Sequence, residues 1–384
     1  MRSEENRKGT ISLSNALKEF GRPQFSAIIK PLGSTCNMNC AYCYYLGKAR
    51  LYNGYQPKMS DETLELLTKQ FIEDNYAEEL SICWHGGEPL LLGLDFFRRA
   101  LEYQKKYAGS KPIVNSIQTN GILLDEQWCQ FFADNKFLVG ISLDGPQDIH
   151  DKYRQDKAGN SSFKKTAEAI NLLKKYSVEF NTLTVINKAS EGQGREIYRF
   201  LRDEIGSRYM QFLPAADKDM PWAVSAEGFG QFLIDVFDEW SRNDIGKTFV
   251  LTFDATLAGW CGITPGLCAF NDICCDSLTI EHNGDIYACD HFVDKKYLLG
   301  NIKEKRLGEL YASSDRIDFV LGKKNELPEE CMKCAWLPLC NGGCPEHRRN
   351  GKNVLCDGFR MYFEHTAELM KKMRDYILSN NRSV

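Results

Sequence analysis

The stretch GSTCNMNCAYCYYL, residues 33–46, places Cys36, Cys40 and Cys43 in C-x3-C-x2-C spacing. With 15 cysteines in 384 residues, chance would give roughly 0.02 such triplets, so composition alone does not explain the spacing. Three thiolates from one short loop can hold three irons of a [4Fe–4S] cluster and leave the fourth iron open to a small molecule. The alternative is a zinc knuckle that lacks one ligand, which the aromatic Tyr42 between the last two cysteines disfavours.

The overall composition is that of an ordinary globular protein. Apolar residues make up 43%, charged residues 26%, and the formal net charge is −4, with enough length for one large domain and one smaller domain. Because neither sign of charge dominates, we expect no nucleic-acid partner and no membrane-surface partner. The N-terminus MRSEENRKGT lacks the apolar core of a secretory signal, and no stretch approaches the roughly 18 apolar residues that span a bilayer. We therefore expect a cytoplasmic protein.

The cysteines fall into two groups. Besides the N-terminal triplet, ten lie between Cys261 and Cys356, and only Cys83 and Cys129 lie outside both groups. In a reducing compartment, clustered cysteines more often bind metal or take part in catalysis than form disulfides. Cys83, in an apolar strand, and Cys129, on a helix, are expected to be buried free thiols.

Short apolar runs alternate with amphipathic runs over the first two thirds of the chain. The apolar runs predict strands at residues 25–32, 80–86, 115–121, 137–145, 178–186 and 208–214. The amphipathic runs predict helices at residues 60–76, 95–107, 125–135, 162–176, after Glu191, and at 225–242. Such alternation implies βαβ units and parallel strands, and six repeats are too few for a closed eight-stranded barrel. We predict an α/β fold with a partial (β/α)6 barrel and an exit helix over residues 22–242.

Distinctive residues follow the predicted strands. The cysteine loop follows the first strand, and the others are Gly86-Gly87-Glu88-Pro89, Thr119-Asn120-Gly121, Ser142-Leu143-Asp144-Gly145 and Gln211-Phe212-Leu213-Pro214. Since α/β barrels build their active sites at the carboxyl ends of the strands, these segments predict one shared site. In the GGEP run, glycines let the backbone approach a ligand closely and its carbonyls accept ammonium hydrogens. A tight turn with a solvated Glu88 is the alternative.

From Gly259 the sequence becomes rich in cysteine, glycine and turn residues, with few long periodic segments. Cys274 and Cys289 frame the pattern C-x9-G-x4-C, followed by C-x2-C-x5-C-x3-C from Cys331 to Cys344 and then by Cys356. The region holds too little apolar sequence for an ordinary core, so metal sites are expected to supply stability. Two zinc ribbons would fit the spacing as well as iron–sulfur clusters. Residues 359–378 predict a closing helix.

The cysteine loop resembles that of the radical S-adenosylmethionine (SAM) enzymes, and GGEP resembles the element that holds the amino group of their cofactor. The resemblance implies that the cluster at Cys36, Cys40 and Cys43 binds SAM. It also implies these cofactor contacts: Tyr42, Gly86, Gly87, Glu88, Ser142, Arg154 and Leu213. In this family pattern Ser142 and Arg154 reach the ribose and the carboxylate, Leu213 packs near the adenine, and Tyr42 contacts SAM through its backbone.

The C-terminal cysteines resemble the SPASM domain, an extension of radical SAM enzymes that modify peptides and proteins. We expect this domain over residues 259–358, followed by a helix and tail over 359–384. The resemblance implies two auxiliary [4Fe–4S] clusters, and therefore three in all. Their ligands would be Cys268, Cys274, Cys289 and Cys344 for one, and Cys331, Cys334, Cys340 and Cys356 for the other. Cys275 remains an alternative to its neighbour Cys274.

More of the chain is similar to one subfamily, the anaerobic sulfatase-maturating enzymes. The segments that carry this similarity are KPLGSTCN, WHGGEPL, IQTNGILL, ISLDGPQDIHDKYR and CDHFV, from residue 30 to residue 293. The resemblance implies that Asp290 is the general base for a substrate thiol or hydroxyl, and we expect secluded, electron-rich surroundings to raise its pKa. The alternative is a hydrogen-bonded loop aspartate. His85 and His291 are further possible substrate contacts.

The implied reaction is oxidation of a cysteine or serine in a sulfatase C/S-x-P/A-x-R motif to Cα-formylglycine, started by a 5′-deoxyadenosyl radical from SAM. The implied partners are an unfolded or nascent sulfatase, or a peptide, and an electron donor such as flavodoxin or ferredoxin. The segment AADKDMPWAVSAEGF is short beside the loop of many sulfatase maturases, and the gap from Cys344 to Cys356 is compact. Two alternatives stay open: a maturase that forms thioether or carbon–carbon links in a ribosomal peptide, and a non-catalytic iron–sulfur or zinc protein.

Overall fold

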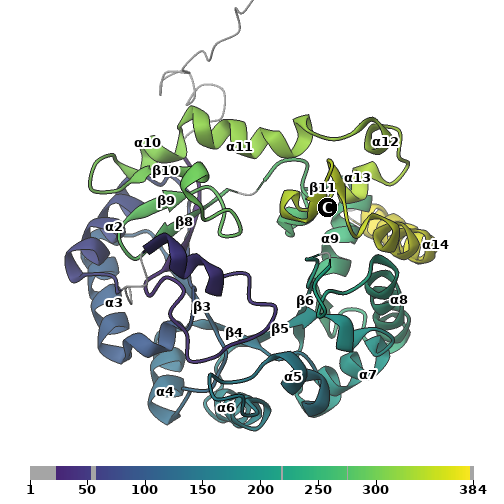
Figure 1. The fold of residues 1–384 in the computed structure, drawn as a ribbon, viewed down its shortest axis with the longest axis horizontal. Coiled ribbons are helices and arrows are strands. Elements are labelled where there is room, and N and C mark those ends of the chain that lie inside the picture. Colours follow the sequence, from purple (N-terminus) through teal and green to yellow (C-terminus); the bar gives the residue numbers. More distant parts are fainter. Residues whose placement is uncertain (1–22, 53–57, 218, 275, 381–384) are drawn as a thin grey trace, which may run out of the picture.

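A curved sheet of parallel strands forms the centre of the molecule (Figure 1). The computed structural model describes residues 23–52, 58–217, 219–274 and 276–380. The first six strands pair in chain order and confirm all six predicted strands: β1 Ser26–Lys30, β2 Leu80–Trp84, β3 Ile113–Thr119, β4 Leu138–Ser142, β5 Phe180–Ile186 and β6 Tyr209–Pro214. Their carboxyl ends therefore meet at one edge, as the partial barrel requires.

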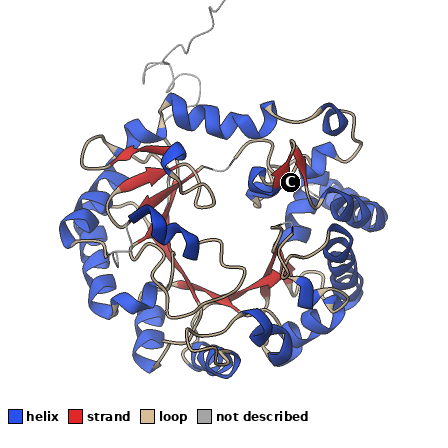
Figure 2. Ribbon diagram, in the orientation of Figure 1, coloured by secondary structure: helices blue, strands red, loops and turns tan. Residues whose placement is uncertain are grey.

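Helices cover the outer face of this sheet (Figure 2). They are α2 Asp61–Glu73, α3 Leu94–Ala108, α4 Glu126–Asp134, α5 Gln147–Tyr153, α6 Phe163–Lys175, α7 Gly194–Arg199 and α8 Ala226–Asn243. Ser60, Asp125 and Ser225 cap α2, α4 and α8 by accepting a backbone N–H with their side chains. The short helix α5 was not predicted, because its seven residues span barely two turns.

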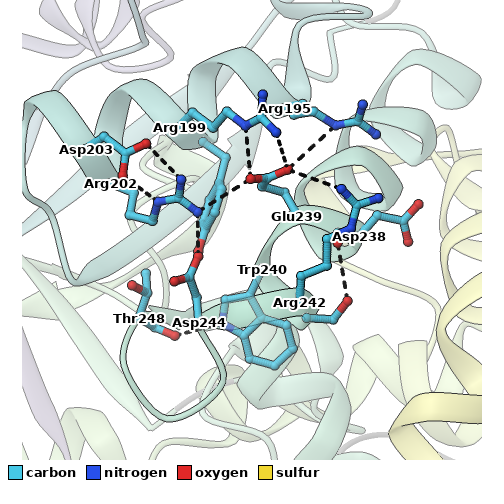
Figure 3. A network of polar contacts seen from close by, with 12 residues as sticks. Arg195, Arg199, Arg202, Asp203, Asp238, Glu239, Trp240, Arg242, Asp244 and Thr248 are labelled. Atoms are coloured by element: carbon cyan, nitrogen blue, oxygen red, sulfur yellow. Dashed lines mark hydrogen bonds and ion pairs between the residues drawn. The ribbon is translucent and has the colours of Figure 1, made fainter.

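Ion pairs fasten α7 to α8 (Figure 3). Both oxygens of the buried Glu239 accept from the guanidinium of Arg199, at 2.9 and 2.8 Å. Arg202 lies 3.6 Å from the same carboxylate and donates to Asp244 at 2.7 Å. Bidentate pairing fixes geometry as well as charge, so this network holds the last helices of the barrel in register.

The C-terminal region continues the barrel sheet. In the part of the chain that the structure describes, ten strands form one sheet in the order β10-β9-β8-β1-β2-β3-β4-β5-β6-β7. β8 Ser277–Glu281 runs parallel to β1, and all five of its residues are buried. β9 Asp285–Tyr287 and β10 Leu298–Asn301 follow as antiparallel strands, while β7 Phe249–Val250 pairs with β6 at the other edge. The region expected to depend on metal is thus also held by backbone pairing with the barrel.

The remaining elements run along the open side of the curved sheet (Figure 1). They are α9 Leu251–Trp260, α10 Leu307–Tyr311, α11 Ser314–Asn325, α12 Glu329–Met332, α13 Leu337–Cys340, the hairpin β11 Arg348–Arg349 and β12 Lys352–Asn353, and α14 Cys356–Asn380. The closing helix is confirmed as α14, which packs on α8. Among the described residues, no helix combines the length and apolar character needed to cross a membrane. The predicted barrel domain begins at residue 22, and the predicted tail ends with residues 381–384. These positions lie outside the described ranges.

Candidate active site

A cavity of about 1310 Å³ lies at the carboxyl ends of the barrel strands. It brings together residues from the ends of all six barrel strands and from the C-terminal region. The sequence-predicted residues on its wall are Cys36, Cys40, Cys43, Tyr42, Gly86, Gly87, Ser142, Arg154, Leu213 and Asp290. His85 and His291 also line it. A single cavity thus joins the cysteine triplet, the residues expected at SAM, and the expected base.

The cysteine loop is anchored from two sides. The N–H groups of Asn39 and Ala41 donate to the carbonyls of Gln155 and Tyr153, at 2.9 and 3.0 Å. The Asn120 side chain, after β3, donates to Asn37 Oδ1 at 2.8 Å. Backbone bonds of this kind fix the loop before any ligand binds, so the three thiols face the cavity from set positions.

The glycines after β2 are required by close backbone packing. The N–H of Gly87 donates to the carbonyl of Gly33 at 2.8 Å, and a Cβ on Gly87 would lie 1.9 Å from the carbonyl oxygen of Thr35. Gly86 has φ +123°, a conformation that favours glycine. The GGEP run therefore lies directly against the cysteine loop, where its exposed backbone can also meet a ligand.

The side chain of Glu88 turns away from the cavity and is buried. Its carboxylate accepts from the Leu90 N–H at 3.1 Å, the Thr119 hydroxyl at 2.8 Å and the Asn120 N–H at 2.8 Å. Burial outweighs these hydrogen bonds and raises the pKa of Glu88 to about 7. Among the described residues of the cavity wall, Gly86 and Gly87 are present but Glu88 is not. Glu88 therefore joins the ends of β2 and β3, and the solvated glutamate considered from sequence is not found.

Arg154 is a buried cation on the cavity wall. Its Nη1 donates to the Tyr42 hydroxyl at 3.1 Å and lies 4.0 Å from the Asp144 carboxylate, to which Tyr42 also donates. The buried Nε of Arg154 has no hydrogen-bond partner among the described residues. Because Arg154 lines the cavity, its guanidinium cation suits an anionic group such as the carboxylate of SAM. The Tyr42 hydroxyl thus links Arg154 to Asp144, and the expected backbone contact of Tyr42 with SAM stays a prediction.

Asp290 lies beside a lysine that sequence reasoning missed. The Nζ of Lys30 lies 3.2 Å from Asp290 Oδ2, and the Tyr44 hydroxyl donates to the same oxygen at 2.7 Å. Burial raises the pKa of Asp290, but Lys30, His291, His85 and Tyr44 lower it by more, so the net pKa falls below the ordinary range. These protein groups alone thus favour the ionised carboxylate, whereas the expected increase in pKa depends on an anionic cluster beside Cys289 and stays a prediction. The sequence signal for this contact was Lys30 itself, a charged residue at the end of the apolar strand β1.

His85 presents one defined nitrogen to the cavity. Its Nδ1 accepts from the Gly86 N–H at 2.7 Å and from Lys30 Nζ at 3.1 Å. Burial and the Lys30 charge lower the pKa of His85 to about 3, so the imidazole is neutral. Because Nδ1 is the acceptor, the proton resides on Nε2. His85 thus offers a hydrogen-bond donor close to the acceptor Asp290.

Four C-terminal cysteines surround a second cavity, of about 590 Å³. They are Cys331, Cys334, Cys340 and Cys356, the set expected for one auxiliary cluster. No three His, Cys, Asp or Glu side chains of the described residues converge closely enough to enclose a single metal ion. Four thiols on one cavity wall match the number of ligands that a [4Fe–4S] cluster takes.

The other expected ligand set is spread around Lys323 and Asp290. Lys323 Nζ donates to the carbonyl of Cys268 at 2.7 Å, and the N–H of Cys274 donates to the carbonyl of Val320 at 3.3 Å. Cys289 Sγ lies 3.9 Å from Asp290 Oδ1. Cys275, the alternative to Cys274, lies outside the described residues.

The chain resembles known proteins over nearly its whole length. A family model of the radical SAM superfamily matches residues 31–201, and one of the SPASM iron–sulfur cluster-binding domain matches residues 272–335. The chain is 41% identical to a serine-type anaerobic sulfatase-maturating enzyme of Bacteroides thetaiotaomicron, covering 94% of this chain and 93% of that protein. It is 36% identical to a cysteine-type enzyme of Clostridium novyi, covering 88% and 94%.

A solved structure of anSMEcpe with bound AdoMet and the Cp18Cys peptide matches with a TM-score of 0.85 at 31% identity, covering 92% of this chain and 100% of that chain. The expected fold class is therefore confirmed. The expected cofactors, SAM with a [4Fe–4S] cluster and further iron–sulfur clusters in the SPASM domain, are confirmed as well, and the zinc readings are set aside. With its thiol triplet, buried arginine and Asp290 on one cavity, the chain belongs to the anaerobic sulfatase-maturating enzymes of the radical SAM superfamily.

Proposed function

We propose that this protein oxidises a serine or cysteine side chain of a sulfatase to Cα-formylglycine. One observation carries the proposal: Asp290 shares a single cavity with Cys36, Cys40, Cys43 and Arg154. A proton acceptor and a radical centre must reach the same substrate residue, and a shared cavity allows this. The serine-type and cysteine-type relatives support the same substrate class.

The cavity residues would hold the cofactor as follows. When bound, SAM and its cluster supply hydrogen-atom abstraction from carbon, and the auxiliary clusters supply an acceptor for one electron. The backbone at Gly86 and Gly87 would accept from the amino group of SAM, and Arg154 would pair with its carboxylate. Ser142 would contact the ribose and Leu213 would pack near the adenine. Glu88 would act indirectly, by joining the two loops that form this surface.

Asp290 would accept the proton of the substrate hydroxyl or thiol. Loss of one Cβ hydrogen atom, one proton and one electron converts –CH2–OH into an aldehyde. The same loss from –CH2–SH gives a thioaldehyde, which water converts into the aldehyde with release of hydrogen sulfide. His85 Nε2–H would donate to the substrate heteroatom or a nearby carbonyl, while Lys30 and Tyr44 hold the carboxylate of Asp290 in place.

We also propose the partners and the location. The substrate protein would enter unfolded or nascent, because the reacting side chain must reach a cavity within the barrel. A small electron-transfer protein such as flavodoxin or ferredoxin would supply electrons. A reducing cytoplasm would suit thiolate-held clusters, which oxidants destroy.

Mass spectrometry of substrate peptides tests this function. The reconstituted protein is incubated without oxygen with SAM, a reductant and a sulfatase-derived peptide that carries serine, cysteine or alanine at the target position. The serine peptide should lose the mass of two hydrogens, and the cysteine peptide should also exchange sulfur for oxygen. The alanine peptide should not change. Cleavage of SAM with all three peptide masses unchanged would refute the substrate assignment.

A further inference from the structure

Two cations in the iron–sulfur domain form no ion pair within 4 Å with a carboxylate of the described residues. Lys323, on α11, is 1% exposed, and Arg348, on β11, is half-buried. The hydrogen bonds that Lys323 Nζ and the Arg348 guanidinium donate all end on backbone carbonyls. Burying a cation is costly unless an anion lies nearby. The charge on these two side chains therefore points to an anionic group between them.

Lys323 lies against the backbone that presents two of the expected ligands. Its Nζ donates to the carbonyl of Cys268 at 2.7 Å and to that of Ala269 at 3.0 Å. One turn earlier on α11, the carbonyl of Val320 accepts the N–H of Cys274 at 3.3 Å. Lys323 and its helix thus contact the backbone of two residues of one predicted ligand set, Cys268 and Cys274.

Arg348 holds the loop between Cys340 and Cys344. Its Nε and Nη2 donate to the carbonyls of Gly342 and Gly343, at 3.2 and 3.4 Å. Both glycines have positive φ, +75° and +65°, which turns these carbonyls toward the arginine. Nη1 donates to the carbonyl of Lys323 at 2.7 Å, so the two cations are directly linked. The nearby carboxylate of Glu326 is exposed to solvent, so it balances the charge of Arg348 only weakly.

We propose that Lys323 and Arg348 balance the charge of the auxiliary cluster at Cys268, Cys274, Cys289 and Cys344 and raise its reduction potential. The proposal rests on the proposed function, which assigns these ligands. A [4Fe–4S] cluster with four thiolates carries about two negative charges when oxidised and about one more when reduced. Fixed cations stabilise the more negative form, so they favour reduction.

This charge would matter for the reaction because substrate oxidation releases one electron beside Asp290. Cys289 precedes Asp290 directly, so the cluster that it would ligate is adjacent to the base. A raised potential makes this cluster the preferred first acceptor. Lys323 and Arg348 are positioning residues in this scheme, since neither lines the main cavity among its described residues.

A redox titration followed by electron paramagnetic resonance tests the proposal without any substrate. The full reconstituted chain is compared with Lys323→Gln, with Lys323→Gln plus Arg348→Gln, and with Lys324→Gln. Lys324 is the matched control, because it is the next residue but 60% exposed and paired with Asp272 at 3.2 Å. Lys323→Gln should shift one auxiliary potential to a more negative value, and the double variant should shift it further. The SAM-binding cluster and the Lys324→Gln protein should keep their wild-type potentials.

The remaining outcomes are also decisive. Full iron content with unchanged potentials in both Lys323→Gln and the double variant would overturn the proposal. If Lys323→Gln loses four irons, Lys323→Arg separates charge from packing: recovery of the iron supports the proposal, and continued loss overturns it. The redox titration contains no sulfatase peptide. The predicted shift in potential, together with failure to oxidise peptides in the mass-spectrometry assay, would therefore refute the proposed function alone.

Discussion

The Nζ of Lys30 lies 3.2 Å from Oδ2 of Asp290, although 260 positions separate the two residues in the chain. Lys30 ends β1, and its partner in the β1–β8 register is Glu281, the last residue of β8. β9 then leads into Cys289 and Asp290. The pairing of β8 with β1 therefore places Asp290 at the barrel cavity.

Replacing Lys30 with methionine should uncouple SAM cleavage from substrate oxidation. The change removes the cation that holds the Asp290 carboxylate ionised and oriented, whereas the cysteine loop and Arg154 remain. We expect formylglycine formation to fall by about 100-fold, on the scale of a lost general base, with 5′-deoxyadenosine still produced. Chromatography of both products from one anaerobic reaction checks this.

Lys111→Met is the matched control for Lys30→Met. Lys111 Nζ donates to the backbone carbonyl of Ile72 at 3.2 Å and does not line the cavity among its described residues. Both products should form at wild-type rates in this control. A proportional fall of both products in Lys30→Met would contradict a role through Asp290 and indicate a general loss of structure.

The local parts of this fold and site could be predicted because their signals are local. Each barrel strand is a short apolar run, and parallel strands place their carboxyl ends together, so the cavity residues after β2, β3 and β4 followed from order alone. The thiols of Cys331, Cys334, Cys340 and Cys356 were grouped by family spacing, and they share one cavity wall.

The missed parts depend on long-range pairing or on ambiguous composition. Nothing in the sequence of β8 indicates that it pairs with β1. The Lys30–Asp290 pair, and its effect on the pKa of Asp290, therefore could not be predicted. The helix α9, LTFDATLAGW, is apolar on most sides and shows no helical periodicity. The role of Glu88 was missed because two of its three donors, Thr119 and Asn120, come from the end of β3, about 30 positions further along the chain.

Glu88 should make stability depend on pH around neutrality. Burial raises the pKa of Glu88 from 4.5 to about 7, so its stabilising contribution is complete below pH 4.5 and is lost as pH rises through 7. The full loss amounts to about 3 kcal/mol by linkage. Anaerobic thermal unfolding of the holoprotein should give a Tm that falls from about pH 5 to about pH 7 and levels off above it.

Two variants isolate this effect. Glu88→Gln should flatten the pH dependence and also lower Tm at pH 6, because its amide would face the Asn120 N–H with a second donor. Glu62→Gln changes an exposed residue of α2 and should keep the wild-type profile. An unchanged slope in Glu88→Gln would assign the pH dependence to another group.

Removal of two thiols from the second cavity should remove one cluster. Cys331→Ala combined with Cys334→Ala takes away half of a four-cysteine ligand set. We expect iron to fall from about 12 to about 8 atoms per chain, with SAM binding retained. Cys129→Ala is the control, since that thiol is buried in α4 and should leave iron unchanged. An unchanged iron content in the double variant would mean that other residues ligate this cluster.

Gly358→Ala should destabilise the packing of α14 on α8. A Cβ on Gly358 would lie 1.9 Å from the carbonyl oxygen of Ala226, and one on Gly230 would lie 2.6 Å from the Cα of Gly358. Overpacking of this kind costs about 1–3 kcal/mol. Because Gly358 lies in the first turn of α14, two residues after Cys356, the displacement should also weaken the cluster in the second cavity.

Gly322→Ala in α11 is the opposite case. Its Cβ would meet only the flexible end of Glu326, at 3.3 Å, so the gain in helix propensity of about 0.5–1 kcal/mol should prevail. Anaerobic thermal unfolding should therefore show a lower Tm for Gly358→Ala and an equal or higher Tm for Gly322→Ala, with iron lost only from the first. Equal stability of the two variants would mean that the helices separate at Gly358 without cost, contrary to the close crossing of their backbones.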